Sequence, residues 1–224
     1  VHRREEDLPV HVVLDLSRSM SRTVPGTPGR DVVGKRAAAA LSWIALQSHD
    51  RVRIHTLPRS GVPHRSVARG ARGFHALLHW LERLPTGGDT DLVGGLRELQ
   101  TQHTRRGLCV VVSDFLDPKG PDAVLGALRS VHHKLLLLRA VLPGEDRPTV
   151  RGPVELVDCE APARRTVLHM DDAAAERHAQ AWHSYQNQLE AIATRRGGRC
   201  AQLRCDAPVP EQLVSMFRDG ELVA

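Results

Sequence analysis

The feature that most constrains the fold of this chain is a series of short apolar segments separated by segments with helical spacing. Pro9–Leu14, Leu108–Ser113 and Lys134–Leu142 are the clearest of the apolar segments. A strand that is apolar along almost its whole length is buried on both faces, as happens in parallel sheets covered by helices. Between these segments, apolar residues recur at the spacing of an amphipathic helix. The pattern therefore predicts an α/β domain with a mainly parallel sheet flanked by helices.

Two further segments extend this prediction. Arg51–Leu57 alternates apolar residues with charged and polar ones, which favours a strand nearer to an edge of the sheet. Asp31 precedes a run of helical spacing that extends to about His49. Because Asp is a preferred N-cap residue, we expect Asp31 to cap this helix.

The alternation of strand and helix patterns is interrupted near residues 150–169. Val154–Val157 and Arg165–Leu168 flank a turn region, which predicts a β-hairpin excursion from the sheet. No internal repeat or long linker divides the chain, and 224 residues suit one α/β domain. We therefore expect a single domain over residues 1–224.

Composition argues against two classes of protein. Aromatic residues make up only 3% of the chain, too few for stacking platforms that bind single-stranded nucleic acid. The formal charge is +5, but the arginines are spread along the chain rather than gathered on one element. The longest apolar run, Leu135–Leu138, is far short of the roughly 20 residues that cross a bilayer. We expect a cytoplasmic protein with no membrane segment, and we do not expect nucleic acid as its partner.

Polar residues follow the predicted strands at three places. Asp15, Ser17 and Ser19 form a DxSxS motif after the first strand, Thr90 follows Gly87-Gly88-Asp89, and Asp114 follows the strand Leu108–Ser113. Ligand sites of parallel α/β sheets lie at the carboxyl ends of the strands, where these loops would converge. Carboxylate and hydroxyl oxygens suit Mg²⁺ or Mn²⁺, and the lack of thiolate or imidazole disfavours zinc.

Each motif alone also has a structural explanation. Asp15, Asp91 and Asp114 could cap helices, and Ser17 could serve a turn. Their occurrence in this order, each after a strand or a glycine turn, favours the metal site. Two other functions stay open: a metal-dependent hydrolase or phosphotransferase with Asp15 as nucleophile, and a basic nucleic-acid-binding domain. Against the enzyme, aspartyl-phosphate enzymes have a second acid two positions after the nucleophile, where this chain has Ser17.

The series DxSxS, Thr and Asp resembles the metal-ion-dependent adhesion site (MIDAS) of von Willebrand factor A domains. More narrowly, the segments Leu14–Met20, Gly87–Leu92 and Val112–Asp117 resemble the bacterial family called domain of unknown function 58. The later segments Gly152–Asp158 and Cys205–Pro208 are similar to that family as well. Its members are often encoded beside MoxR-type AAA+ ATPases.

The resemblance implies a Rossmann-like domain of the von Willebrand factor A type. By position, the hydroxyls of Ser17, Ser19 and Thr90 would bind the metal, and Asp15 and Asp114 would act directly or through water. One coordination position would stay open for an Asp or Glu side chain of a partner.

The resemblance also implies roles for flanking segments and for the whole domain. Asp91 would cap the following helix, Asp117 would lie at the rim of the site, and Val1–Asp7 would be the remnant of an N-terminal region. The implied function is a non-enzymatic, metal-dependent protein-interaction module. It would act as an adaptor or co-chaperone of a MoxR-type AAA+ ATPase.

Overall fold

The computed structural model describes residues 8–48, 50–57, 65–67, 71–101 and 105–218. Its centre is a six-stranded sheet with the strand order β3-β2-β1-β4-β5-β8. Five of these strands run parallel, and β3 pairs antiparallel to β2. The strands are β1 (Pro9–Asp15), β2 (Arg51–Leu57), β3 (Arg65–Val67), β4 (Leu108–Ser113), β5 (Lys134–Val141) and β8 (Arg199–Arg204). The predicted mainly parallel α/β architecture is confirmed.

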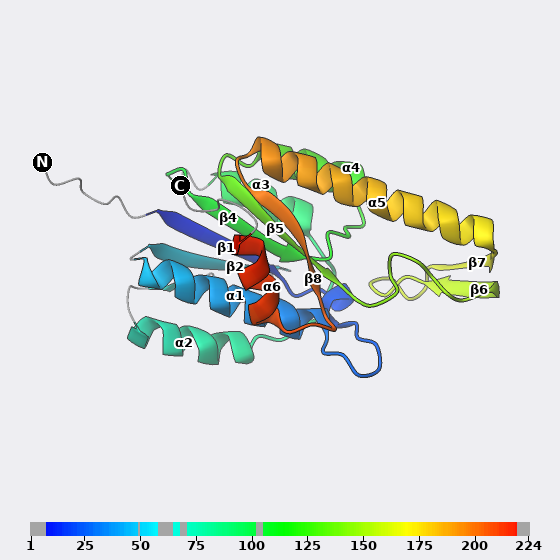
Figure 1. Ribbon diagram of the computed structural model, residues 1–224, viewed down its shortest axis with the longest axis horizontal. Helices are drawn as coiled ribbons and strands as arrows, with labels where there is room; N and C mark the ends of the chain where they lie inside the picture. The colour runs from blue at the N-terminus through cyan, green and yellow to red at the C-terminus, as the bar shows by residue number, and fades with distance from the viewer. Residues whose placement is uncertain (1–7, 49, 58–64, 68–70, 102–104, 219–224) are drawn as a thin grey trace, which may run out of the picture.

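Helices cover both faces of the sheet (Figure 1). One face carries α1 (Arg30–Gln47), α2 (Ala71–Glu82) and α6 (Val209–Arg218). The other carries α3 (Leu92–Thr101), α4 (Pro121–Ser130) and α5 (Asp172–Arg195). Within the described residues, no helix combines the length and the apolar character needed to cross a membrane.

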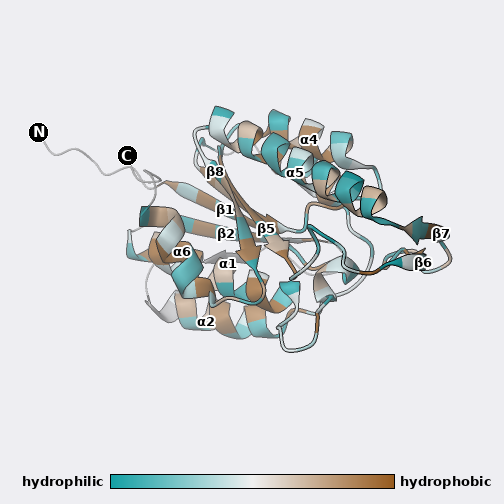
Figure 2. Ribbon diagram, turned by 45° about the vertical axis from the view of Figure 1, so that its right-hand side comes forward, coloured by the Kyte–Doolittle hydropathy of each residue, from teal (hydrophilic) through white to brown (hydrophobic). Residues whose placement is uncertain are grey.

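The two faces of β1 show why the strand sequences are apolar throughout. Val12 and Leu14 point into the core beneath α1 and α2, whereas Val13 points into the core beneath α3 and α4. All three side chains are at most 1% exposed. Figure 2 shows the same division, with hydrophobic strands inside and mostly hydrophilic surfaces on α5. The central strands have no polar face because no face of them meets water.

Two details differ from the sequence predictions. Asp31 is not the N-cap of α1: Gly29 holds that position, and Asp31 Oδ2 instead accepts a hydrogen bond of 2.7 Å from Thr86 Oγ1. The tertiary contact to Thr86 competes with capping for the same carboxylate. The second difference is β3, which the sequence pattern did not predict and which places β2 one strand in from the edge.

A two-stranded antiparallel hairpin joins β5 to α5 and extends beyond the carboxyl ends of the sheet strands (Figure 1). It consists of β6 (Gly152–Val157) and β7 (Arg165–Met170), so the predicted hairpin is confirmed. Asp171 then caps α5 by accepting a hydrogen bond of 2.6 Å from the amide of Ala174. The hairpin therefore lies at the edge of the sheet where the predicted site residues lie.

Candidate metal centre

The first loop of the site follows β1 directly. Asp15 is the last residue of the strand, and its Oδ1 accepts a hydrogen bond of 2.9 Å from the amide of Ser17. The chain then enters a short 3₁₀ helix, η1 (Arg18–Ser21), which brings the hydroxyls of Ser17 and Ser19 to 3.0 Å from one another. Asp15, Ser17 and Ser19 are all buried. The DxSxS motif thus gathers three oxygen-bearing side chains at the end of one strand.

The second loop is held against the first by two backbone hydrogen bonds. The amide of Gly87 donates to the carbonyl of Leu16 at 2.8 Å, and the amide of Arg18 donates to the carbonyl of Gly88 at 3.0 Å. Gly87 and Gly88 have φ of 144° and 84°, which residues with a Cβ rarely adopt. The glycine pair therefore allows the close contact that places Thr90 Oγ1 3.4 Å from Asp15 Oδ2.

The third loop follows β4 and brings a second carboxylate to the site. Ser113 Oγ donates a hydrogen bond of 2.7 Å to Asp15 Oδ2. Asp114, which is 3% exposed, accepts from the amide of Leu116 at 3.0 Å through Oδ1. Its Oδ2 is buried and has no hydrogen-bond partner. An unpartnered buried carboxylate oxygen is costly unless a cation lies beside it.

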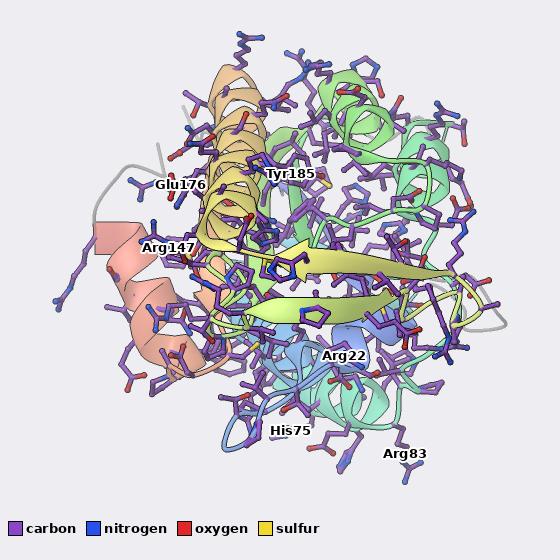
Figure 3. All side chains as sticks on the ribbon, turned by 90° about the vertical axis from the view of Figure 1, so that its right-hand side faces the viewer. Arg22, His75, Arg83, Arg147, Glu176 and Tyr185 are labelled. Atoms are coloured by element: carbon purple, nitrogen blue, oxygen red, sulfur yellow. The ribbon has the colours of Figure 1, made fainter. Side chains whose placement is uncertain are left out.

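Phe115 completes the third loop in an unusual backbone conformation. Its φ is +60°, although it is not glycine. Its amide donates to Ser113 Oγ at 2.9 Å, and its carbonyl accepts a hydrogen bond of 2.7 Å from Tyr185 Oη on α5. Figure 3 shows Tyr185 on the side of α5 that faces the rest of the domain. These contacts hold the backbone next to Asp114 in place.

Asp91 and Asp117 occupy the supporting positions that the sequence predicted. Asp91 Oδ1 accepts from the amide of Gly94 at 3.0 Å, in the first turn of α3. Asp117 Oδ2 accepts from the amide of Val93 at 3.2 Å and so ties the third loop to the same helix. Neither residue belongs to the cluster around Asp15.

The two site carboxylates influence one another electrostatically. Burial and the neighbouring charge of Asp114 raise the pKa of Asp15 to about 7, although hydrogen bonds from Ser113 and Ser17 oppose the shift. Two carboxylates enclosed together repel one another when both are ionised. A divalent cation between them would remove this repulsion and favour the ionised form of both.

Arg30 is a part of the site that sequence reasoning missed. Its Nη1 lies 3.7 Å from Asp114 Oδ2 and donates a hydrogen bond of 2.7 Å to the carbonyl of Ser19. Its Nη2 forms an ion pair with Glu145, which follows β5. Burial lowers the pKa of this guanidinium, opposed by the charge of Asp114. These contacts link Arg30, at the start of α1, to loops far away in the sequence, so no local motif indicates that Arg30 belongs to the site.

Glu160 is the second residue that the sequence analysis did not single out. It lies in the turn of the β6–β7 hairpin, and its Oε2 accepts a hydrogen bond of 3.0 Å from the amide of Thr90. Its Oε1 is buried without a hydrogen-bond partner. Burial raises the pKa of Glu160 and the charge of Asp114 adds to the shift, whereas hydrogen bonding to the amide of Thr90 and to the side chain of Ser19 opposes it. Figure 3 shows the hairpin lying across this edge of the sheet.

The donor set fits a hard divalent cation. It comprises two carboxylates and three hydroxyls, all of them oxygen ligands of the kind that Mg²⁺ and Mn²⁺ prefer. The Oδ2 of Asp114 accepts no hydrogen bond, and its charged neighbour is the Arg30 guanidinium at 3.7 Å. In the described part of the chain, no group of three or more His, Cys, Asp or Glu side chains is arranged to hold a metal. A cation at this edge would therefore depend on the hydroxyls.

The chain matches a known protein family over most of its length. The family described as "Protein of unknown function DUF58" matches residues 1–188. The chain belongs to the DUF58 family. The uncharacterized protein Rv1480 of Mycobacterium tuberculosis (strain ATCC 25618 / H37Rv) is 26% identical to this DUF58 domain over 207 residues, covering 90% of the chain and 64% of the relative. The uncharacterized protein MAV169 of Mycobacterium avium is 30% identical over 104 residues, covering 46% of this chain and 61% of that protein. The DUF58 domain thus spans somewhat less than two thirds of these relatives.

A solved structure shows the fold type. The von Willebrand factor A (VWA) domain of SpRpn10 is similar with a TM-score of 0.51 and 11% sequence identity, covering 98% of this chain and all of that one. At this identity the likeness shows the fold alone. The DUF58 domain therefore has a Rossmann-like VWA fold, as the resemblance implied.

Proposed function

We propose that this DUF58 domain binds Mg²⁺ or Mn²⁺ through Asp15, Ser17, Ser19, Thr90 and Asp114, and that the bound cation binds an acidic side chain of a partner protein. The observation that carries the proposal is the buried Oδ2 of Asp114, which lies in the same enclosed cluster as Asp15 and has no hydrogen-bond partner, since the Arg30 guanidinium is 3.7 Å away. The VWA fold supports the coarser statement that the domain is a protein-interaction module.

An open coordination position at the cation would favour an acidic partner. Asp15 and Asp114 together balance the charge of a divalent cation, and the hydroxyl ligands add no charge. Arg30 adds a positive charge at 3.7 Å from Asp114, and its ion pair with Glu145 offsets that charge. These residues would therefore leave no excess of negative charge to repel a carboxylate that completes the coordination of the cation.

For the partner we propose a MoxR-type AAA+ ATPase or one of its client proteins, with the DUF58 domain as adaptor or co-chaperone in the cytoplasm. The support is the family resemblance, since members of this family are often encoded beside such ATPases. An adaptor needs a recognition site rather than a reactive one. The cluster suits this role, because Asp15 Oδ2 is occupied by hydrogen bonds from Ser113 and Thr90.

The direct test of metal binding is thermal unfolding with and without Mg²⁺, at about pH 8 so that Asp15 is ionised. For a dissociation constant of about 1 mM, about 10 mM Mg²⁺ stabilises the folded state by roughly 1.4 kcal/mol. In a domain of this size the midpoint Tm rises by about 3–5 °C. The double variant Ser17→Ala/Ser19→Ala should lose this rise.

The matched control is Ser21→Ala. Ser21 is exposed in the same 3₁₀ helix and donates only to the carbonyl of Arg18, so its variant should keep the full rise in Tm. The proposal is contradicted if wild type shows no rise with either Mg²⁺ or Mn²⁺. It is equally contradicted if the double variant rises as much as the wild type.

A further inference from the structure

The turn of the β6–β7 hairpin places a carboxylate of this chain at the candidate metal centre. Glu160 Oε2 is hydrogen-bonded to the amide of Thr90, one of the proposed metal ligands. Glu160 Oε1 is buried and has no hydrogen-bond partner, although the residue as a whole is only partly buried. Burying a carboxylate oxygen without a hydrogen-bond partner costs free energy, which a cation beside that oxygen would offset.

The local structure of the turn holds this glutamate in place. Asp158 Oδ1 accepts hydrogen bonds from the amides of Glu160 and Ala161, at 2.9 and 3.2 Å. The amide of Arg164 donates to the carbonyl of Ala161 at 2.7 Å, which closes the turn. Arg18, from the DxSxS loop, contacts the carbonyl of Glu160 at 3.4 Å through Nη1. The turn therefore contacts both the first and the second loop of the site.

The strands of the hairpin are not part of the central sheet. They form a separate two-stranded sheet, and such sheets are marginally stable on their own. Several of its apolar side chains are exposed, including Val167 at 73% and Leu156 at 51%. No residue of the hairpin belongs to either of the two core clusters, so a displacement of the hairpin would leave both cores intact.

We propose that the hairpin closes the site from within the same chain, with Glu160 holding the place that the acidic side chain of a partner would take. This inference rests on the proposed function, because it assigns Glu160 the open position at the proposed cation. In the free protein the Glu160 side chain would shift from the amide of Thr90 to bind the cation at this position, and it would keep other carboxylates out. A partner binds only when its own acidic residue displaces Glu160 and the hairpin moves aside.

The test uses Mn²⁺ as the probe, because the relaxation of water protons reports both how much Mn²⁺ is bound and how many waters the bound ion keeps. Wild type is compared with Glu160→Ala and with the control Glu155→Ala. Glu155 lies on β6 and pairs with Arg165 at the surface, so its variant matches the change in net charge away from the site. Sodium acetate then serves as a free carboxylate that competes for the open position.

The closure predicts three results for Glu160→Ala. The affinity for Mn²⁺ falls by at least about tenfold. The bound ion gains one water, and acetate displaces water from it, whereas acetate has no effect on wild type or on Glu155→Ala. The proposal is overturned if Glu160→Ala keeps the hydration and acetate response of wild type, even with a weakened affinity, because the glutamate then acts only through its charge.

The same experiment separates this inference from the proposed function. If wild type and both variants all fail to bind Mn²⁺, the metal site itself is refuted and the closure with it. If all three bind Mn²⁺ alike, with the same number of waters, the metal site stands and the closure alone is refuted. Thermal unfolding of Glu160→Ala without metal verifies that the variant is folded.

Discussion

The contact between Tyr185 and Phe115 connects the long helix α5 to the third loop of the site, and Tyr185→Phe removes it with little change in shape. The lost interaction is one hydrogen bond of 2.7 Å to a backbone carbonyl. A buried bond of this kind contributes about 1–2 kcal/mol, because the carbonyl left behind has no new partner. Holding Phe115 at φ +60° costs a further 1–2 kcal/mol or so, which the contacts of its amide and carbonyl offset in wild type.

We therefore expect Tyr185→Phe to lower the free energy of unfolding by about 1.5 kcal/mol, measured by urea denaturation without metal. For a domain of this size the Tm falls by about 3–6 °C. The stabilisation by Mg²⁺ should also shrink, because the backbone next to Asp114 is released. Ser184→Ala is the control, since Ser184 is exposed on the same helix and its loss should change stability by less than about 0.5 kcal/mol. A Tyr185→Phe variant as stable as the control would refute this account of the third loop.

Tyr185 is also the only tyrosine of the chain, and burial raises its pKa well above the usual range. Tyrosinate absorbance should therefore appear only as the protein unfolds above about pH 10. Tyrosinate formation in the native protein near pH 10 would contradict this expectation. Asp15→Asn should abolish stabilisation by Mg²⁺. Without metal, the variant should be at least as stable as wild type at about pH 8, because it lacks a buried carboxylate whose raised pKa opposes folding at that pH. If Asp15 were instead a nucleophile, wild type would hydrolyse a phosphate ester that this variant does not. Burial and the neighbouring His133 and Arg53 lower the pKa of His11 to about 4, so the unfolded chain gains a proton first and His11 should lower stability by at most about 3 kcal/mol between about pH 6.5 and 4. Because the raised pKa of Asp15 has the opposite effect over this range, the measurement is the difference in urea denaturation between wild type and His11→Asn, and a difference that does not change with pH would contradict the shift. Gly88→Ala and Gly26→Ala both place a Cβ at positive φ, so each should lower the free energy of unfolding by about 1–2 kcal/mol. Only Gly88→Ala should weaken Mg²⁺ binding, measured by calorimetry. Equal affinities of the two variants would show that the Gly87-Gly88 turn does not position Thr90.

Sequence patterns predicted the parts of this fold that depend on local periodicity. The apolar segments became the central strands because each of their faces meets a layer of helices. The hairpin also followed from local signals. Asp31 shows the limit of such signals, because a capping preference of about 1 kcal/mol competes with a tertiary hydrogen bond to Thr86.

In the candidate site too, motifs indicated some residues, whereas only tertiary packing places the others. The order of DxSxS, Thr and Asp indicated which three loops meet, because topology brings the carboxyl ends of β1 and β4 together. Arg30 and Glu160 could not be found in this manner, since they reach the site from the start of α1 and from the hairpin turn. Neither residue lies in a motif, and only the packing of distant segments places them beside Asp114 and Thr90. The positive φ of Phe115 is likewise set by packing, because the sequence has no glycine at this position that would indicate it.

The central claim is that Asp15, Ser17, Ser19, Thr90 and Asp114 hold one divalent cation. The most direct test is a crystal structure of this chain grown with Mn²⁺, with anomalous scattering used to locate the ion. We expect one strong peak at the carboxyl ends of β1 and β4, with the hydroxyls of Ser17 and Ser19 at about 2.0–2.3 Å from the ion. A peak held by other residues, or none at this edge while Mn²⁺ binds elsewhere, would contradict the claim.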